Sequence, residues 1–259
     1  IIAKSMRGRH ISEAELAQAT GVSPDILHRL CRGEFCDEPA LLKVAGALSL
    51  DPRALTMSAS KVWRPRPVDI DGLEIFNTPY RDMRVNAFLI WDPETKVGAA
   101  FDTGTDSSSL VAKATVEGVT IDSIFITHTH NDHIADLDRL KAACPGAGIY
   151  SNEAEPWPGT ETFSEGDIFS IQGLSVYTFT TSGHSKGGTT YYITGLSKPV
   201  AVVGDAMFAG SMGGGMVSFE DAWNNNREKI LTLPDETIVC PGHGPMSSIG
   251  EEKRNNPFF

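Results

Sequence analysis

The stretch FITHTHNDHIAD, residues 125–136, places three of the chain's seven histidines and two aspartates within twelve positions. The run IDSIFITH leads into it, and this continuous apolar segment bounded by turn residues predicts a fully buried strand. The polar side chains therefore lie where a core strand opens onto a loop, which is where α/β proteins bind ligands. An unpaired buried polar group is costly, so side chains at such a place must be paired or ligated. The residues concerned are His128, His130, Asp132 and His133.

Three later strand ends carry side chains of the same type. His184 lies in TSGHSKGGTT, Asp205 ends the apolar run of PVAVVGDAMF, and His243 lies in VCPGHGPM. Each follows a predicted strand and a turn that contains glycine. The remaining histidines, His10 and His28, lie in helical sequence, and we expect both to be surface residues that bind no metal. Imidazole and carboxylate together suit zinc, iron or manganese rather than calcium.

The order of these motifs resembles that of a known family. THTHNDH, GHS, GDAMF and PGHG follow one another as in the metallo-β-lactamase-fold hydrolases, and the resemblance covers residues 68–259. The ending CPGHGPMSSIGEEKRNNPFF resembles more narrowly the glyoxalase II-like branch, also called hydroxyacylglutathione hydrolase-like. The resemblance implies an α/β fold, a four-layer αβ/βα sandwich with the metals at one edge of its two sheets. The implied cofactors are two divalent metal ions, zinc first, with iron or manganese as alternatives.

The resemblance also assigns each ligand. The implied ligands are His128, His130 and His184 for the first metal, Asp132, His133 and His243 for the second, and Asp205 as the bridge between them. It implies a metal-bridging hydroxide as the nucleophile, so that no serine or cysteine nucleophile is required. Asp132 is the implied catalytic residue, which orients the hydroxide or accepts a proton. By proximity, residues Thr127, Thr129, Asp102 and Ser182 are candidates to hold the ligands in place, with a purely structural role as the alternative.

The first 60 residues predict short helices instead. SEAELAQAT and VSPDILHRLCRG each fit a helix, with Ser23 as N-cap, Pro24 at the first helical position, and Gly21 and Gly33 as stops. EPALLKVAGALSLDP predicts a third helix. Over about 45 residues the segment resembles the Cro/repressor-type helix-turn-helix family, which implies that the helix starting near Ser23 enters the DNA major groove.

We therefore expect two domains, a helix-turn-helix domain over residues 1–60 and a metallo-β-lactamase-fold domain over residues 61–259. KVWRPRPVDIDG, residues 61–72, breaks helical periodicity and predicts the linker. Residues 1–60 contain seven Lys or Arg and seven Asp or Glu, so little positive charge is available to neutralise phosphates. DNA binding and a dimerisation or structural role both stay open for this domain. A homodimer or higher homo-oligomer is expected.

The composition limits the cellular compartment and the classes of binding partner that we expect. The net charge of −11 argues against broad contact with a polyanion. No apolar run approaches the length of a membrane helix, and we expect neither a signal peptide nor a membrane partner. Four cysteines without a C-x-x-C pair predict buried reduced thiols and a cytoplasmic protein. They are Cys31, Cys36, Cys144 and Cys240.

These patterns favour a hydrolase of a small-molecule substrate, namely an ester, thioester or lactone. A mononuclear iron sulfur-dioxygenase of the persulfide type and a transcription regulator with a metallo-hydrolase-fold sensor domain are the alternatives. FAGSMGGGMVSFEDAW follows Asp205 where glyoxalase II-like proteins usually carry a Gly-Arg segment, which argues against a glutathione thioester. Its GSMGGG lacks the Lys-Ser/Thr of a phosphate-binding loop and is expected to be a flexible loop over the metal site. Four methionines either line an acyl pocket or pack in the core, namely Met207, Met212, Met216 and Met246.

Overall fold

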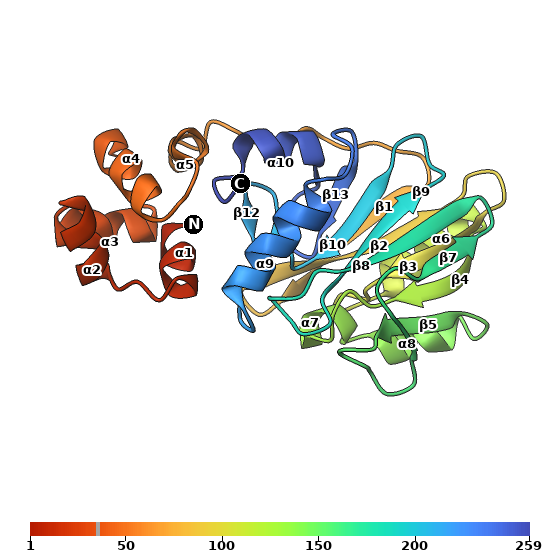
Figure 1. Ribbon diagram of the computed structural model, residues 1–259. Coiled ribbons are helices and arrows are strands. Elements are labelled where there is room, and N and C mark those ends of the chain that lie inside the picture. Colours follow the sequence, from red (N-terminus) through yellow and green to blue (C-terminus); the bar gives the residue numbers. More distant parts are fainter. Residues whose placement is uncertain (35–36) are drawn as a thin grey trace.

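The computed structural model describes residues 1–34 and 37–259, so the buried thiol predicted for Cys36 lies outside the described residues. A group of helices at the N-terminus is followed by two sheets packed face to face (Figure 1). The N-terminal helices are α1 (Ile2–Gly8), α2 (Glu13–Thr20), α3 (Pro24–Arg32), α4 (Glu38–Ala47) and α5 (Pro52–Ala59).

Local sequence signals fix most of these helix ends. The Ser23 hydroxyl accepts the Ile26 amide hydrogen at the start of α3, and Gly21 and Gly33 adopt left-handed φ angles of 65° and 70° after α2 and α3. The sequence predicted three helices, and the structure adds α1 and α5. Helix α5 is separate because the Asp51 carboxylate caps it, accepting the Ala54 amide hydrogen at 2.6 Å.

The first sheet has six strands in chain order, with the first three antiparallel and the rest parallel. They are β1 (Leu73–Tyr80), β2 (Met83–Trp91), β3 (Val97–Phe101), β4 (Thr120–Phe125), β5 (Gly148–Asn152) and β6 (Glu161–Phe163). In the second sheet only β10 and β13 pair in parallel. Its spatial order is β14 (Ser247–Ser248), β13 (Ile238–Pro241), β10 (Val200–Gly204), β9 (Thr189–Thr194), β8 (Leu174–Thr180) and β7 (Ile168–Ile171). A short hairpin follows Asp205, formed by β11 (Met207–Phe208) and β12 (Ser211–Met212).

Helices cover the outer face of each sheet, which gives the four layers predicted from the sequence. On the first sheet α6 (Ser108–Glu117) and α8 (Leu137–Ala143) bury Leu110 and Leu140. On the second, α9 (Phe219–Asn225), a π-helical turn at Asn226–Ile230 and α10 (Ile249–Asn255) cover the strands. The aromatic rings of Phe101, Phe125 and Tyr191 pack between the sheets. Within the described residues, every helix is too short or too polar to cross a bilayer.

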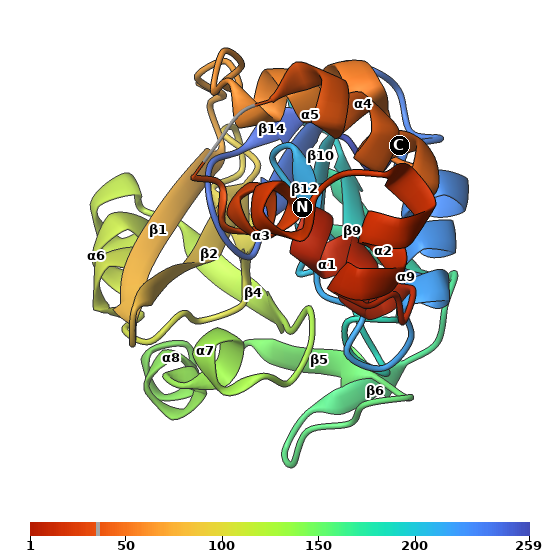
Figure 2. The same ribbon diagram turned by 90° about the vertical axis from the view of Figure 1, so that its left-hand side faces the viewer.

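The N-terminal helices share a hydrophobic core with the end of the chain. Leu16 and Leu27 belong to the same buried cluster as Met212, Phe219 and Phe258. Figure 2, which views the molecule from the side of these helices, shows α1 in front of β12 and α5 beside the last strands. Residues 62–70, within the predicted linker, form neither helix nor strand. The limits of the two domains stay a prediction. Among the described cysteines, Cys240 is buried, Cys31 and Cys144 are half-buried, and all three are free thiols.

Candidate metal centre

The motif HTHNDH lies in a loop and a single helical turn, α7 (Asn131–Ile134), beyond the end of β4. Strand β4 ends at Phe125, so the loop that follows, and not the pleat of the strand, sets the directions of His128 and His130. The loop turns away because the Thr127 amide donates to the Asp102 carboxylate at 2.7 Å instead of continuing a strand ladder.

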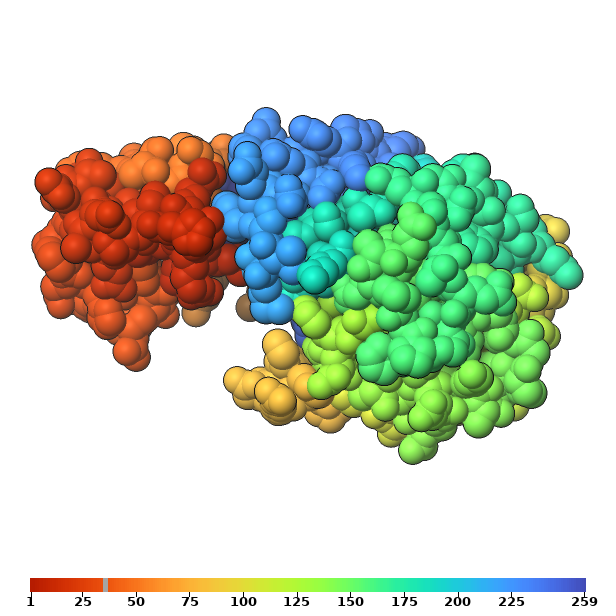
Figure 3. Space-filling model, turned by 60° about the horizontal axis from the view of Figure 1, so that its bottom comes forward, coloured from red at the N-terminus to blue at the C-terminus, as the bar shows by residue number. Residues whose placement is uncertain are grey.

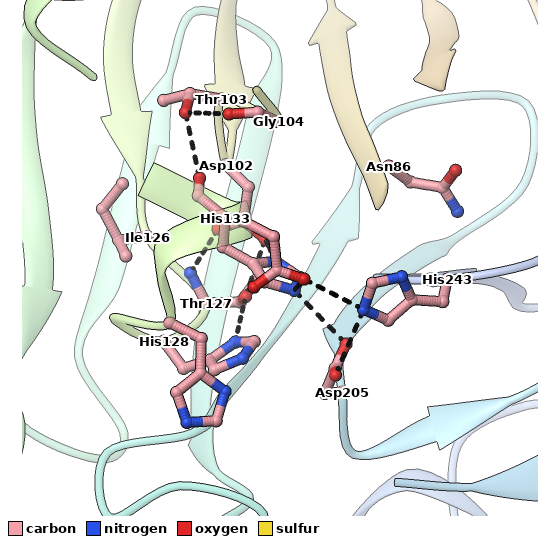
Figure 4. Close-up of polar contacts among 12 residues, drawn as sticks. Asn86, Asp102, Thr103, Gly104, Ile126, Thr127, His128, His133, Asp205 and His243 are labelled. Atoms are coloured by element: carbon pink, nitrogen blue, oxygen red, sulfur yellow. Dashed lines mark hydrogen bonds and ion pairs between the residues drawn. The ribbon is translucent and has the colours of Figure 1, made fainter. Parts of the chain in front are cut away.

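The structure brings all seven predicted ligand residues together at one edge of the two sheets. Their nitrogen and carboxylate oxygen atoms form three overlapping groups, each with its atoms within 4.8 Å of one another. The groups are His128–His130–His184, His128–His133–Asp205 and Asp132–His133–His243. Figure 4 shows His133, Asp205 and His243 pointing toward one another from three different segments. The two histidines expected elsewhere are exposed, His10 in the turn after α1 and His28 on α3.

One carboxylate fixes two of the imidazole rings. Asp102 Oδ2 lies 2.7 Å from His133 Nδ1 and accepts the Thr127 hydroxyl hydrogen at 2.7 Å. Because that hydroxyl hydrogen is used, Thr127 Oγ1 can only accept from His128 Nδ1, which lies 3.0 Å away. Both rings therefore carry their hydrogen on Nδ1 and present the Nε2 lone pair to the centre.

Backbone carbonyls orient two further rings in the same way. His184 Nδ1 lies 2.9 Å from the Gly214 carbonyl oxygen, and His243 Nδ1 lies 2.6 Å from the Arg84 carbonyl oxygen. A carbonyl oxygen only accepts, so each ring again presents Nε2. His130 differs, since its Nδ1 faces His184 Nε2 at 3.0 Å.

The atoms that face inward fit a bound metal. His128 Nε2, His133 Nε2 and Asp205 Oδ1 are buried without a hydrogen-bond partner among the described residues. Unpartnered buried atoms of this kind are costly unless a ligand or ion satisfies them. A donor set of imidazole nitrogens and carboxylate oxygens suits zinc, iron or manganese.

The charged groups at the centre also indicate a bound cation. Burial would raise the pKa of Asp205, but its contacts with His133 and His243 hold that pKa well below its usual range. Burial would likewise lower the pKa of His243, yet hydrogen bonds to Asp132 and Asp205 raise it to about 10. The pKa of His128 is well below normal because of burial and the neighbouring His133. The carboxylates therefore attract positive charge to a buried place, which a divalent cation supplies.

The predicted catalytic residue, Asp132, lies in the second group. Its Oδ2 atom is 3.3 Å from His243 Nε2 and 3.8 Å from His133 Nε2. Burial opposes ionisation of Asp132, but the hydrogen bond with His243 outweighs it and lowers the pKa. Asp132 is thus a carboxylate at neutral pH, and its catalytic role stays a prediction.

The other candidate residues fall into two classes. Asp102 and Thr127 contact the rings of predicted ligands, as described above. Thr129 instead donates its amide and hydroxyl hydrogens to Glu155 Oε1, at 2.7 and 2.6 Å. Ser182 contacts Asn225, which donates to its carbonyl oxygen at 3.0 Å, so its role is structural.

Two residues that hold the loops escaped the sequence analysis. Glu155 Oε2 accepts the Gly187 amide hydrogen at 2.8 Å, so this carboxylate joins the His130 loop to the His184 loop. Asn86 Nδ2 donates to the carbonyl oxygens of Pro241 and Gly244, both at 2.8 Å, and thereby holds the His243 loop. Neither residue lies in a motif, and only the fold brings them to these loops.

The glycine-rich segment after Asp205 passes close to the centre. A β-carbon on Gly213 would lie 1.7 Å from the Asp205 carbonyl oxygen, and one on Gly242 would lie 2.2 Å from Asp205 Oδ1. Glycine is required at both positions because the backbone itself approaches the site. The flexibility predicted for this segment stays a prediction.

The four methionines near the motifs divide between packing and exposure. Met207 and Met212 are fully buried, and Met246 packs against the core between the sheets. Met216 is 67% exposed. Core packing therefore accounts for three of them.

Two face-to-face sheets with outer helices and a histidine–aspartate cluster at one edge define a mixed α/β protein suited to bind metal. Residues 80–243 match the family described as the Metallo-beta-lactamase superfamily, and the chain belongs to this family. Among its relatives, hydroxyacylglutathione hydrolase GloC of Haemophilus influenzae is 29% identical over 206 residues, which cover 70% of this chain and 95% of the relative. Probable metallo-hydrolase YqgX of Bacillus subtilis is 29% identical over 207 residues, with the same coverage of 70% and 95%.

Solved structures agree with this assignment. The crystal structure of the BLEG-1 B3 metallo-beta-lactamase superposes with a TM-score of 0.63 at 26% identity, covering 71% of this chain and 99% of that one. The structure of TTHA1623 in a di-iron-bound form gives a TM-score of 0.57 at 25% identity, covering 71% of this chain and all of the other. The chain is therefore a metal-dependent hydrolase homologue whose N-terminal helices lie outside the matched segment.

Proposed function

We propose that this protein is a dinuclear metal-dependent hydrolase of the glyoxalase II-like branch, acting on a small ester, thioester or lactone. The observation that carries the proposal is the position of Asp205 between the two predicted ligand groups. Its Oδ2 atom is 3.4 Å from His184 Nε2 and also 3.4 Å from His243 Nε2. One carboxylate thus contacts a ligand of each proposed metal, as a bridge requires.

When bound, two divalent ions would lower the pKa of water and polarise the substrate carbonyl. The residues of the chain keep the proposed metal ligands in position. Asp102 and the carbonyl oxygens of Gly214 and Arg84 keep each imidazole in the tautomer that presents Nε2. Asp132 stays ionised beside His243 and can orient water or take its proton.

The comparisons support a hydrolase, since GloC is named a hydroxyacylglutathione hydrolase. The test is elemental analysis of the purified protein combined with a panel of thioesters, esters and lactones. Two metal ions per chain and hydrolysis that is lost on chelation and regained on adding zinc are the expected results. A protein that binds no metal, or that hydrolyses equally well without it, would refute the proposal.

An iron enzyme is the second candidate for this site. The solved relative TTHA1623 was obtained in a di-iron-bound form, so this fold accommodates iron. The same analysis separates the two chemistries. One iron per chain, with oxygen uptake on a persulfide and no thioester hydrolysis, would establish a sulfur dioxygenase instead.

For residues 1–60 we propose a Cro/repressor-type helix-turn-helix module. The support is the pair α2 and α3, which pack together and are joined by a short turn that starts at the left-handed Gly21. A regulator would shift genomic DNA fragments in a salt-dependent way, with the metal site acting as a sensor. Absence of binding at low salt would leave these helices a structural or dimerisation role.

A further inference from the structure

The N-terminal helix α1 places a lysine beside the metal centre. Lys4 Nζ donates to Ser211 Oγ at 3.2 Å and to the Met212 carbonyl oxygen, and it lies 5.4 Å from the centre of the Phe208 ring. That ring in turn is 5.7 Å from the His243 ring. Lys4 thus reaches the site through the β11–β12 hairpin, although it lies far outside the family-matched residues 80–243.

The positive charge of Lys4 has no acidic partner. An ammonium group has three hydrogens to donate, and the two contacts of Lys4 are both to uncharged acceptors. No carboxylate lies within ion-pair distance of Nζ among the residues that the structure describes. Two charged groups act on the pKa of Lys4 besides burial: Asp205 raises it, and Arg7, on the next turn of α1, lowers it. Burial lowers the pKa of Lys4, as expected for a desolvated ammonium without a counter-ion.

A groove reaches the metal centre at His243, the ligand whose ring faces the Phe208 ring that Lys4 contacts. In Figure 3 a hollow separates the N-terminal helices, in red, from the segment near residue 80, in yellow-orange. A groove of about 550 Å³ runs along this segment to His243, lined by Met83 and Arg84 among others. The side chains of Met83 and Met216 are exposed. Apolar surface therefore lies on the groove side of His243, and the ammonium group of Lys4 lies on its Phe208 side.

We propose that Lys4 binds a carboxylate carried by the substrate, so that the N-terminal helix selects anionic esters or thioesters for the metal centre. This inference rests on the proposed hydrolase function and adds the substrate class. The third ammonium hydrogen would donate to the substrate carboxylate, and the charge-assisted hydrogen bond would offset the cost of keeping the cation partly buried.

A purely structural role for Lys4 makes a different prediction. If Lys4 only fastened α1 to the hairpin, its loss would move the segment whose Gly214 carbonyl oxygen orients His184. The metal site would then be disturbed, and activity toward every substrate would fall equally. If Lys4 binds the substrate, only substrates with a negative charge should be affected.

The test compares two para-nitrophenyl esters of equal shape, the mono-ester of adipic acid and the neutral ester in which an isopropyl group replaces the carboxylate. Lys4→Met and Lys4→Arg are measured as zinc-loaded proteins, beside Lys43→Met as the control, since Lys43 is exposed on α4. Lys4→Met should raise KM for the anionic ester by about tenfold or more while leaving kcat and the neutral ester unchanged. Lys4→Arg should retain most of the preference. Equal effects on both esters, or none, would overturn the inference.

A binding measurement keeps this result separate from the proposed function. Calorimetric titration with adipate, the product, needs no turnover. If the wild-type protein hydrolyses no thioester, ester or lactone of the panel but binds adipate more tightly than Lys4→Met does, the hydrolase proposal fails and the anion site stands. If adipate binds the two proteins equally, or binds neither, Lys4 is not an anion-binding residue. Thermal unfolding of each variant checks that the fold is intact.

Discussion

Asp102 and His133 form a buried pair in which the carboxylate oxygen Oδ2 lies 2.7 Å from the ring nitrogen Nδ1. The same carboxylate accepts both the amide and the hydroxyl hydrogens of Thr127. One side chain, itself no ligand, therefore fixes a ring in each of the two proposed metal sets. Asp102 adopts a left-handed φ of 57°, which asparagine and aspartate tolerate better than most residues.

Asp102→Asn should lower zinc affinity by about 10- to 100-fold. Asparagine keeps the shape and the backbone conformation but cannot accept from His133, the Thr127 amide and the Thr127 hydroxyl as a charged carboxylate does. Competition with a chromophoric chelator measures the loss, and Asp138→Asn, at an exposed position on α8, is the matched control. Wild-type affinity in Asp102→Asn would show that the pair does not orient the ligands.

His130→Ala should remove most of the bound metal and essentially all hydrolytic activity. His130 belongs to the first ligand group, and its Nδ1 lies 3.0 Å from His184 Nε2, so the two ring nitrogens are close enough to bind one cation in place of their mutual hydrogen bond. Elemental analysis and the ester panel measure both losses, with His28→Ala on α3 as the control. Full activity with an intact metal content in His130→Ala would refute the ligand assignment.

The ligand residues could be predicted from the sequence because each one follows a strand and a turn within a few positions. The residues that hold the ligand loops from other parts of the chain could not be predicted in this way. Asn86 binds the His243 loop from β2, more than 150 positions away, and Glu155 joins two motifs from a segment that has no motif of its own. Helix α1 was also missed, because no side chain caps it and its buried residues pack on segments far along the chain.

Glu155→Gln should lower the free energy of unfolding by about 1–3 kcal/mol, because partly buried donors lose a charged acceptor. The carboxylate accepts from the Thr129 amide and hydroxyl and from the Gly187 amide, so its neutral replacement leaves at least one of them poorly satisfied. Chemical denaturation of the metal-free protein isolates this effect from metal binding. The exposed Glu153→Gln is the control, and equal stability of the two variants would contradict the role given to Glu155.

Glu252→Gln should change how stability depends on pH. Burial raises the pKa of Glu252 from 4.5 to about 7, so the folded protein holds this proton more tightly than the unfolded chain does. The stability that the protonated group contributes is complete below about pH 4.5 and is lost as the pH rises through about 7. Glutamine stays neutral, and its one oxygen can still accept from the Gly210 amide and Asn256 Nδ2, as Oε2 of Glu252 does.

The variant should therefore match the wild-type protein in acid and exceed it above neutral pH. The gap in the free energy of unfolding should grow by up to roughly 3 kcal/mol between pH 4.5 and 8, since each pKa unit corresponds to about 1.4 kcal/mol. Urea denaturation at a series of pH values measures this gap, with the exposed Glu228→Gln as the control. Parallel stability profiles of Glu252→Gln and the wild-type protein would mean that Glu252 is already ionised in the folded state at acid pH.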